Sequence, residues 1–102
     1  MVVEVKWTTQ TLDDIENIAN FIAKDSEHYA VVQTERFFEK ARILETHPLA
    51  GHFVPELKSE NIRQLIEGNY RIIYTIVSAD RIDILTIHHG KRLLSNNPQF
   101  EV

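Results

Sequence analysis

The chain has 102 residues, 43% of them hydrophobic, and a formal net charge of −4. This is the usual size of one domain with its own core, so we expect a single domain over residues 1–102. The absence of cysteine excludes disulfides and thiolate metal sites and is compatible with a reducing cytosol. No apolar run approaches the roughly 20 residues that cross a bilayer, and the first residues lack the pattern of a secretory signal. We therefore expect a soluble, cytoplasmic protein.

The charge is unevenly distributed along the chain. Residues 1–55 hold five Lys/Arg and nine Asp/Glu, whereas residues 56–92 hold six Lys/Arg and five Asp/Glu. An acidic chain is a poor non-specific binder of phosphate, because that binding depends on clustered cations and counterion release. Any contact with nucleic acid would therefore depend on a local patch in the second half.

The first half predicts one strand and two helices. Residues 2–7 alternate with a period of two, which favours a strand, and Thr8 or Thr9 is a suitable N-cap for a helix over residues 9–24. A break at Asp25-Ser26 precedes a second helix that ends before Pro48 and Gly51. The apolar stripe expected in the first helix is Leu12, Ile15, Ile18, Ala19 and Ile22, and in the second helix Ala30, Thr34, Phe37, Phe38, Ala41 and Leu44. The two helices form an antiparallel αα-hairpin.

The second half changes to the period of strands. Residues 62–67 and 70–77 are β-rich runs separated by Gly68-Asn69, a two-residue hairpin signal, and residues 81–88 form a third run after another tight turn. The fold class predicted is α+β with the order β-α-α-β-β-β, in which an antiparallel sheet packs against the αα-hairpin. Residues 93–102 are polar and contain Pro98, so we expect a tail or a short irregular segment.

The Gly68-Asn69 turn also predicts the register, because it pairs Glu67 with Tyr70 and each earlier residue with a later one. One face of this hairpin then carries Arg63, Leu65, Tyr70, Ile72, Tyr74 and Ile76. The other face carries Ile62, Gln64, Ile66, Arg71, Ile73, Thr75 and Val77. We assign the aromatic face to the helices. The second face, with three isoleucines around Arg71, is then open and predicts a binding surface, since a monomer rarely leaves such a patch bare.

Several motifs along the chain resemble those of one toxin superfamily. Residues 70–74 read Tyr-Arg-Ile-Ile-Tyr, and residues 84–92 form a strand that ends in His-Gly-Lys-Arg. A first strand ending in Trp7, the string Leu12-Asp13-Asp14-Ile15, and the segment from Pro48 to Leu57 precede them in the expected order. Over residues 3 to about 94 the chain resembles the RelE/ParE superfamily, the toxins of type II toxin–antitoxin (plasmid stabilisation) systems.

This resemblance implies a growth-inhibiting toxin that a co-produced antitoxin wraps and neutralises. RelE-like members are similar to ribosome-dependent mRNA endonucleases that need no metal or other cofactor, whereas ParE-like members act on DNA gyrase. A third alternative is a relic that binds an antitoxin but is not toxic. The antitoxin tail would lie over the apolar open face and the helix grooves. The assemblies expected are a homodimer or a heterotetramer with the antitoxin.

The candidate catalytic residues follow from the same resemblance. Arg71 matches the catalytic arginine of RelE-like toxins and Arg92 a second functional arginine. The lysines of RelE fall at Ile62 and Gln64, and Pro98 stands near its terminal tyrosine. A YoeB-like site would instead use Glu56 as base, Arg71 as phosphate clamp, and His89 or His88 as acid. The departures from RelE and the acidic net charge favour a ParE-like toxin.

Structural roles are the alternatives for these residues. Arg71 could pair with a carboxylate of the sheet or of the antitoxin, and Glu56 could be a solvated loop carboxylate. Adjacent His88 and His89 point to opposite faces of a strand, so together they cannot hold one metal. Arg63 would stack across the strands on Tyr74. The residues predicted to bind a partner are Arg63, Ile62, Ile66, Ile73 and Lys91.

Overall fold

The structure is a computed structural model that describes residues 2–90 of the chain. The predicted tail over residues 93–102, Lys91 and Arg92 therefore lie outside the described residues. The elements in chain order are β1 (Glu4–Trp7), α1 (Thr9–Ala23), α2 (Glu27–Ala41), the 3₁₀ helix η1 (Arg42–Glu45), β2 (His52–Phe53), β3 (Ile62–Glu67), β4 (Tyr70–Ser78) and β5 (Arg81–His89). The predicted β-α-α-β-β-β order is confirmed, with the short strand β2 added. Within the described part, no helix is both long and apolar enough to cross a membrane.

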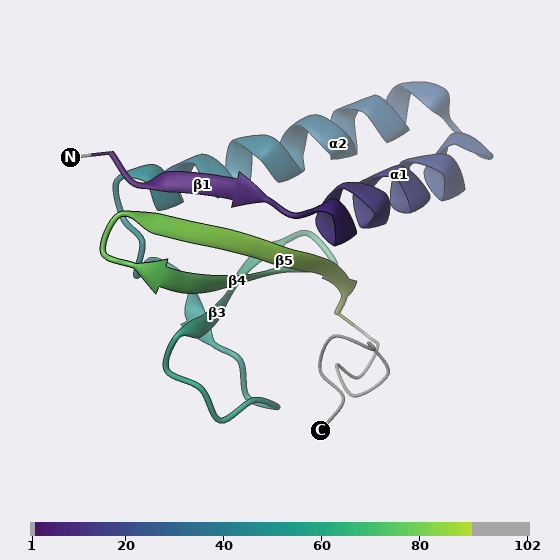
Figure 1. The fold of residues 1–102 in the computed structure, drawn as a ribbon. Coiled ribbons are helices and arrows are strands. Elements are labelled where there is room, and N and C mark those ends of the chain that lie inside the picture. The colour runs from purple at the N-terminus through teal and green to yellow at the C-terminus, as the bar shows by residue number, and fades with distance from the viewer. Residues whose placement is uncertain (1, 91–102) are drawn as a thin grey trace.

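The five strands form one sheet in the order β1-β5-β4-β3-β2. The predicted antiparallel meander is β3-β4-β5, and β1 adds to its β5 edge in a parallel orientation. The helical hairpin follows β1 in the sequence and precedes the other strands. In space, it packs on one face of the sheet (Figure 1). This crossover through two helices is what allows the first strand to be parallel to the last.

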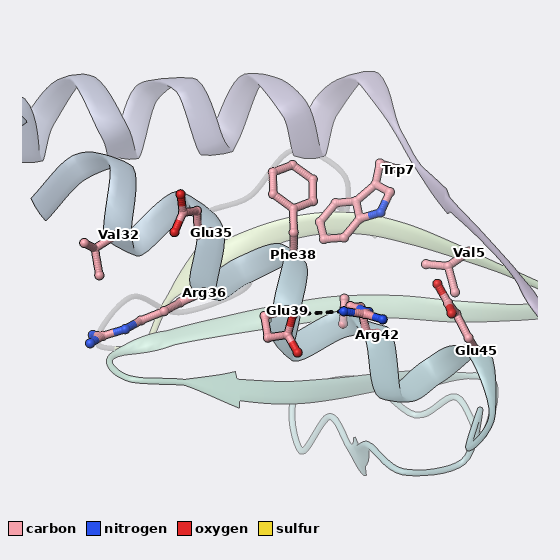
Figure 2. Close-up of a pocket in the computed structure, with 10 residues that line it drawn as sticks. Val5, Trp7, Val32, Glu35, Arg36, Phe38, Glu39, Arg42 and Glu45 are labelled. Atoms are coloured by element: carbon pink, nitrogen blue, oxygen red, sulfur yellow. Dashed lines mark hydrogen bonds and ion pairs between the residues drawn. The ribbon is translucent and has the colours of Figure 1, made fainter. Parts of the chain in front are cut away.

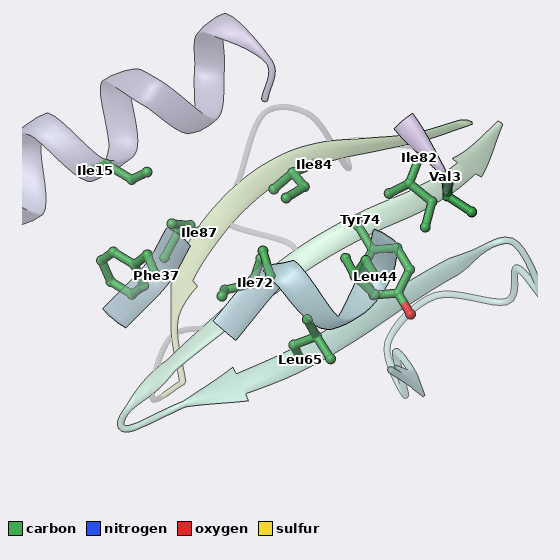
Figure 3. Close-up of a cluster of buried hydrophobic side chains, with 11 residues drawn as sticks. Val3, Ile15, Phe37, Leu44, Leu65, Ile72, Tyr74, Ile82, Ile84 and Ile87 are labelled. Atoms are coloured by element: carbon green, nitrogen blue, oxygen red, sulfur yellow. The ribbon is translucent and has the colours of Figure 1, made fainter. Parts of the chain in front are cut away.

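The predicted register of the β3–β4 hairpin is confirmed. Glu67 pairs with Tyr70 and Ile62 with Thr75, and Gly68 takes the positive φ of 59° that the turn requires. The aromatic face does pack under the helices. Its core, drawn in Figure 3, consists of Val3, Ile15, Phe37, Ala41, Leu44, Leu65, Ile72, Tyr74, Ile82, Ile84 and Ile87.

Helix α1 is rotated relative to the stripe that its sequence predicts. Thr8 is the N-cap, with its side chain accepting from the Thr11 N–H, and the buried Thr11 hydroxyl donates to the Ile84 carbonyl at 2.7 Å. Leu12, predicted to be buried, is 48% exposed instead. Because successive helical residues are about 100° apart, docking the polar Thr11 on β5 turns Leu12 toward solvent.

Asp14 anchors the same helix to β5. Its Oδ2 atom accepts from the Thr86 hydroxyl and, at 3.1 Å, from the Ile87 N–H. Strand β1 ends at Trp7, which pairs with Ile84, so Asp14 supplies an acceptor beyond the end of that strand. A backbone donor at this edge of β5 is thereby satisfied by a helix side chain.

We predict that Asp14→Ala destabilises the fold, because it removes the acceptor of the Ile87 N–H and of the buried Thr86 hydroxyl. The expected loss is about 1–3 kcal/mol in the free energy of unfolding, measured by urea denaturation. Asp13→Ala is the matched control, since Asp13 is exposed and carries the same charge. Equal stability of the two variants would contradict this role of Asp14.

Candidate functional site

The chain after η1 wraps around the β3 edge of the sheet and covers the face opposite the helices. On the helix face, the buried Tyr74 hydroxyl donates to the Pro48 carbonyl at 3.0 Å and accepts from the Gly51 N–H at 2.9 Å. Strand β2 then pairs with β3 at the edge of the sheet. Residues 54–61, which we call the strap, continue on the far face. The face expected to be open is therefore partly covered by the chain itself.

The strap is held on the sheet by a turn with apolar ends. The Leu57 N–H donates to the Val54 carbonyl at 3.1 Å, which closes a β-turn with Pro55 at its second position, where proline is favoured. Val54 is buried against the fully buried Ile73, and Leu57 packs beside them. Val54 and Leu57, the first and last residues of the turn, thus exclude water from the centre of this face.

This packing corrects part of the predicted binding surface. Ile73 is fully buried beneath Val54 and so is not part of the exposed surface, and Ile62 is half-buried against the same cluster. Ile66 lies beyond the strap and is 47% exposed, so it is the isoleucine of this face that a partner can reach.

The turn places Glu56 on Arg71. Arg71 Nη1 donates to Glu56 Oε1 at 3.0 Å and Nη2 to Oε2 at 2.8 Å, so each carboxylate oxygen receives one N–H group. The side chains are 11% and 32% exposed, respectively. Gln64 Oε1 accepts a further bond from Nη1 at 3.3 Å. Glu56 is therefore an ion-pair partner and not the solvated loop carboxylate that the sequence analysis offered as its alternative role. Arg71 is held by two residues of its own chain.

The two histidines lie on opposite faces, as expected from their adjacency. His88 is buried and is the cross-strand partner of Arg71, so it shares the strap face with the Glu56–Arg71 pair. His89 pairs with Tyr70 and makes an edge-to-face contact with its ring at 5.5 Å on the helix face. Of the residues predicted as a catalytic set, the structure thus brings together Glu56, Arg71 and His88.

Arg63 does not stack on Tyr74 as predicted. Its guanidinium lies over the Phe53 ring at 4.5 Å and donates to the Gly51 carbonyl at 3.0 Å. The reason is strand β2, which places Phe53 directly opposite Arg63. Arg63 therefore stabilises the start of the wrapping segment.

Two tyrosines of the helix face are held neutral at physiological pH. Burial raises the pKa of Tyr74, an effect that the Gly51 N–H and the Arg63 charge partly offset. Burial also raises the pKa of Tyr70, with a smaller contribution from Tyr29. Because an ordinary tyrosine already titrates near pH 10, neither can serve as a base near neutral pH.

A second surface lies between β1 and α2. It is a groove of about 730 Å³ with an aromatic end, where the rings of Trp7 and Phe38 are 4.6 Å apart (Figure 2). Phe38, predicted to be in the buried stripe of α2, is 39% exposed here. The groove is lined by Val5, Trp7, Val32, Glu35, Arg36, Phe38, Glu39, Ala41, Arg42 and Glu45.

A family model described as the ParE toxin of the type II toxin–antitoxin system parDE matches residues 5–94. The chain belongs to the ParE toxin family. Its fold is shared with the chromosomal ParDE toxin–antitoxin system from P. aeruginosa, at 19% identity and a TM-score of 0.71, over 86% of this chain and 96% of that one. No curated protein sequence is significantly similar to this chain.

The fold also matches a structure of the toxin–antitoxin complex RelBE2 from Mycobacterium tuberculosis. Here the identity is 20% and the TM-score 0.55, over 87% of this chain and 99% of that one. The ParE fold and the RelE fold are thus variants of one architecture, so the target has to be inferred from the site.

The sequence predicted an antitoxin over the helix grooves, but it did not predict the contact of Gln64 with Arg71 or the part that Trp7 and Phe38 play in a groove. The contact of Gln64 could have been predicted, because the predicted register already places Gln64 on the face of Arg71. Ile66 lies opposite Arg71, and Gln64 is the diagonal neighbour two residues before Ile66. The groove had no such signal, because the rotation of α2 against β1 depends on packing over the whole hairpin.

We predict that Tyr74→Phe destabilises the chain by about 1–3 kcal/mol, because it leaves the buried Gly51 N–H without its acceptor. Tyr70→Phe is the control, since it removes a hydroxyl from a neighbouring tyrosine of the same face. Thermal unfolding below pH 9, where both phenols are neutral, measures the difference. If the two variants unfold at the same temperature, the Tyr74 hydroxyl does not anchor the wrapping segment.

Proposed function

We propose that this ParE-family chain is a growth-inhibiting toxin that acts on DNA gyrase in the cytoplasm and is neutralised by a cognate antitoxin. The observation that carries the choice of target is the engagement of Arg71 by Glu56. A cation that is to hold a phosphate must be accessible to it, whereas this guanidinium is mostly buried and both outer nitrogens bind a carboxylate of its own chain.

The residues around Arg71 support the same target. Ile62 and Gln64 stand where RelE-like nucleases would have lysines, and Ile62 packs against Val54 while Gln64 is buried against Arg71. Among the described residues of β3, these two positions therefore add no cation to the face on which Arg71 of β4 lies. An RNA phosphate would find little positive charge to stabilise it.

A metal-independent mRNA endoribonuclease is the alternative, and one observation favours it. Glu56, Arg71 and His88 lie on one face, which is the set that a YoeB-like cleavage would require. A relic that binds antitoxin without toxicity is the second alternative, and growth after induction distinguishes it from both toxins.

We predict that induced expression of the chain arrests growth and that the purified chain inhibits supercoiling by DNA gyrase. Mapping of mRNA 5′ ends after induction should show no new cuts. New 5′ ends that disappear in Arg71→Ala would instead establish the nuclease, and unimpaired growth with normal gyrase activity would establish the relic.

We further propose that the antitoxin docks in the groove between β1 and α2. The groove combines exposed aromatic and aliphatic side chains with flanking charges, which is the composition of a protein-binding surface. The complex-forming neighbour RelBE2 supports an antitoxin partner for this fold. The antitoxin tail would bury Phe38 beside Trp7.

We predict that Phe38→Ala weakens binding of the cognate antitoxin by at least about tenfold, as for a buried aromatic anchor. Phe21→Ala is the matched control, because Phe21 is 69% exposed on α1 and does not line the groove. Trp7 is the single tryptophan, so its emission reports occupancy directly. Equal affinities of the two variants, with no change in Trp7 emission on binding, would place the antitoxin elsewhere.

A further inference from the structure

Strand β1 lies at one edge of the sheet, and backbone groups on its outer side are free. The N–H groups of Glu4 and Thr8 donate, at 2.8 and 3.3 Å, to carbonyl oxygens in and just before β5, so residues 4, 6 and 8 bond to that strand. Because backbone groups alternate in direction along a strand, those of Val5 and Trp7 point outward. Within residues 2–90 no hydrogen bond engages these outward groups, and both residues line the groove between β1 and α2 (Figure 2).

An open edge of this kind is a template for a second copy of the same chain. In a two-fold antiparallel pair, one register joins Val5 of each copy to Trp7 of the other and satisfies every outward N–H and C=O group of both residues. A register shifted toward the N-terminus would need Val3, whose N–H already donates to the Glu45 carbonyl at 2.8 Å. A shift in the other direction reaches Thr9, where α1 begins. The edge therefore favours one register for self-pairing.

This register places Lys6 of one copy directly opposite Lys6 of the other. The two residues form a non-hydrogen-bonded pair, because the backbone groups of Lys6 face β5. In such a pair the Cα atoms are only about 4.5 Å apart, and the side chains are closer than in a hydrogen-bonded pair. Like charges directly opposite each other destabilise the pairing of two strands. The two ammonium groups would thus repel each other at the two-fold axis.

The charge of Lys6 is not neutralised within the described chain. Its neighbour on β5 is Asp83, but Arg81 binds both carboxylate oxygens of Asp83, through Nε at 3.0 Å and Nη2 at 3.1 Å. Lys6 is exposed and makes no ion pair with residues 2–90. Its positive charge is therefore presented to any strand that approaches the edge.

We propose that Lys6 keeps the outer edge of β1 from pairing with a second copy of the chain. The edge itself stays open, so a strand with a neutral or acidic residue opposite Lys6 can still pair with it. Lysine on an edge strand is a recurrent protection against edge-to-edge association. This inference does not depend on whether gyrase or mRNA is the target.

We expect Lys6→Thr to self-associate with a dimer dissociation constant at least about tenfold lower than that of the unmodified chain, since like charges that meet at an interface are strongly unfavourable. Sedimentation velocity at low ionic strength measures this constant. Amide hydrogen exchange at Val5 and Trp7 should slow in the dimer, because their N–H groups bond across the pair. Lys24→Thr is the matched control, because it removes the same charge from an exposed position at the end of α1.

A mixture of oppositely charged chains tests the role of the charge itself. Lys6→Glu alone should stay monomeric, because its carboxylates repel each other in the same register. An equimolar mixture of Lys6→Glu with the unmodified chain should form a one-to-one dimer, because an ammonium group then faces a carboxylate. This mixture also carries the test if Lys6→Thr does not fold.

Three results would each overturn the proposal. The first is that Lys6→Thr associates no more tightly than Lys24→Thr. The second is a dimer in which the amides of Val5 and Trp7 exchange as fast as in the monomer. The third is a mixture of Lys6→Glu with the unmodified chain that stays monomeric.

Discussion

The ion pair between Glu56 and Arg71 joins the strap to the face of the sheet that the helices leave uncovered. A sheet of this size has two faces to protect from water, and the αα-hairpin covers one of them. The strap covers the centre of the other with Val54 on Ile73, and the ion pair neutralises the cation beside that small core. Glu56 and Gln64 both bind the guanidinium of Arg71, whose side chain is 11% exposed, and these contacts limit the access of other molecules to it.

The helices and the meander were predictable because their signals are local. A period of two and the Gly68-Asn69 turn determine the register of β3 and β4, and that register assigns every residue to a face. The helical pattern locates α1 but does not determine which residue of the helix faces the sheet. The hydrogen bond from Thr11 to Ile84 turns Thr11 inward, so that the neighbouring Leu12 faces solvent. Parallel pairing of β1 with β5 likewise depends on how the chain returns from the hairpin.

The site was predictable in its residues but less so in its arrangement. The resemblance to the RelE/ParE superfamily singles out Glu56 and Arg71 with His89 or His88, but the observed pairing of β4 with β5 is what places His88, and not His89, on the face of Arg71. The segment between η1 and β3 has no periodicity, so nothing local indicates that it wraps around an edge and covers Ile73. A surface expected to be open is for this reason partly filled by its own chain. The shared fold of the ParDE and RelBE2 structures leaves the target to such details.

Glu56 and Arg71 must be paired in the folded chain for the strap to be held on the sheet as described, and a double-mutant cycle tests this pairing most directly. Urea unfolding of the unmodified chain, Glu56→Gln, Arg71→Gln and the double variant yields the coupling free energy between the two side chains. A partly buried pair with two-point geometry predicts a favourable coupling of about 1 kcal/mol or more. A coupling within about 0.3 kcal/mol of zero, the scatter expected for independent sites, would contradict the account.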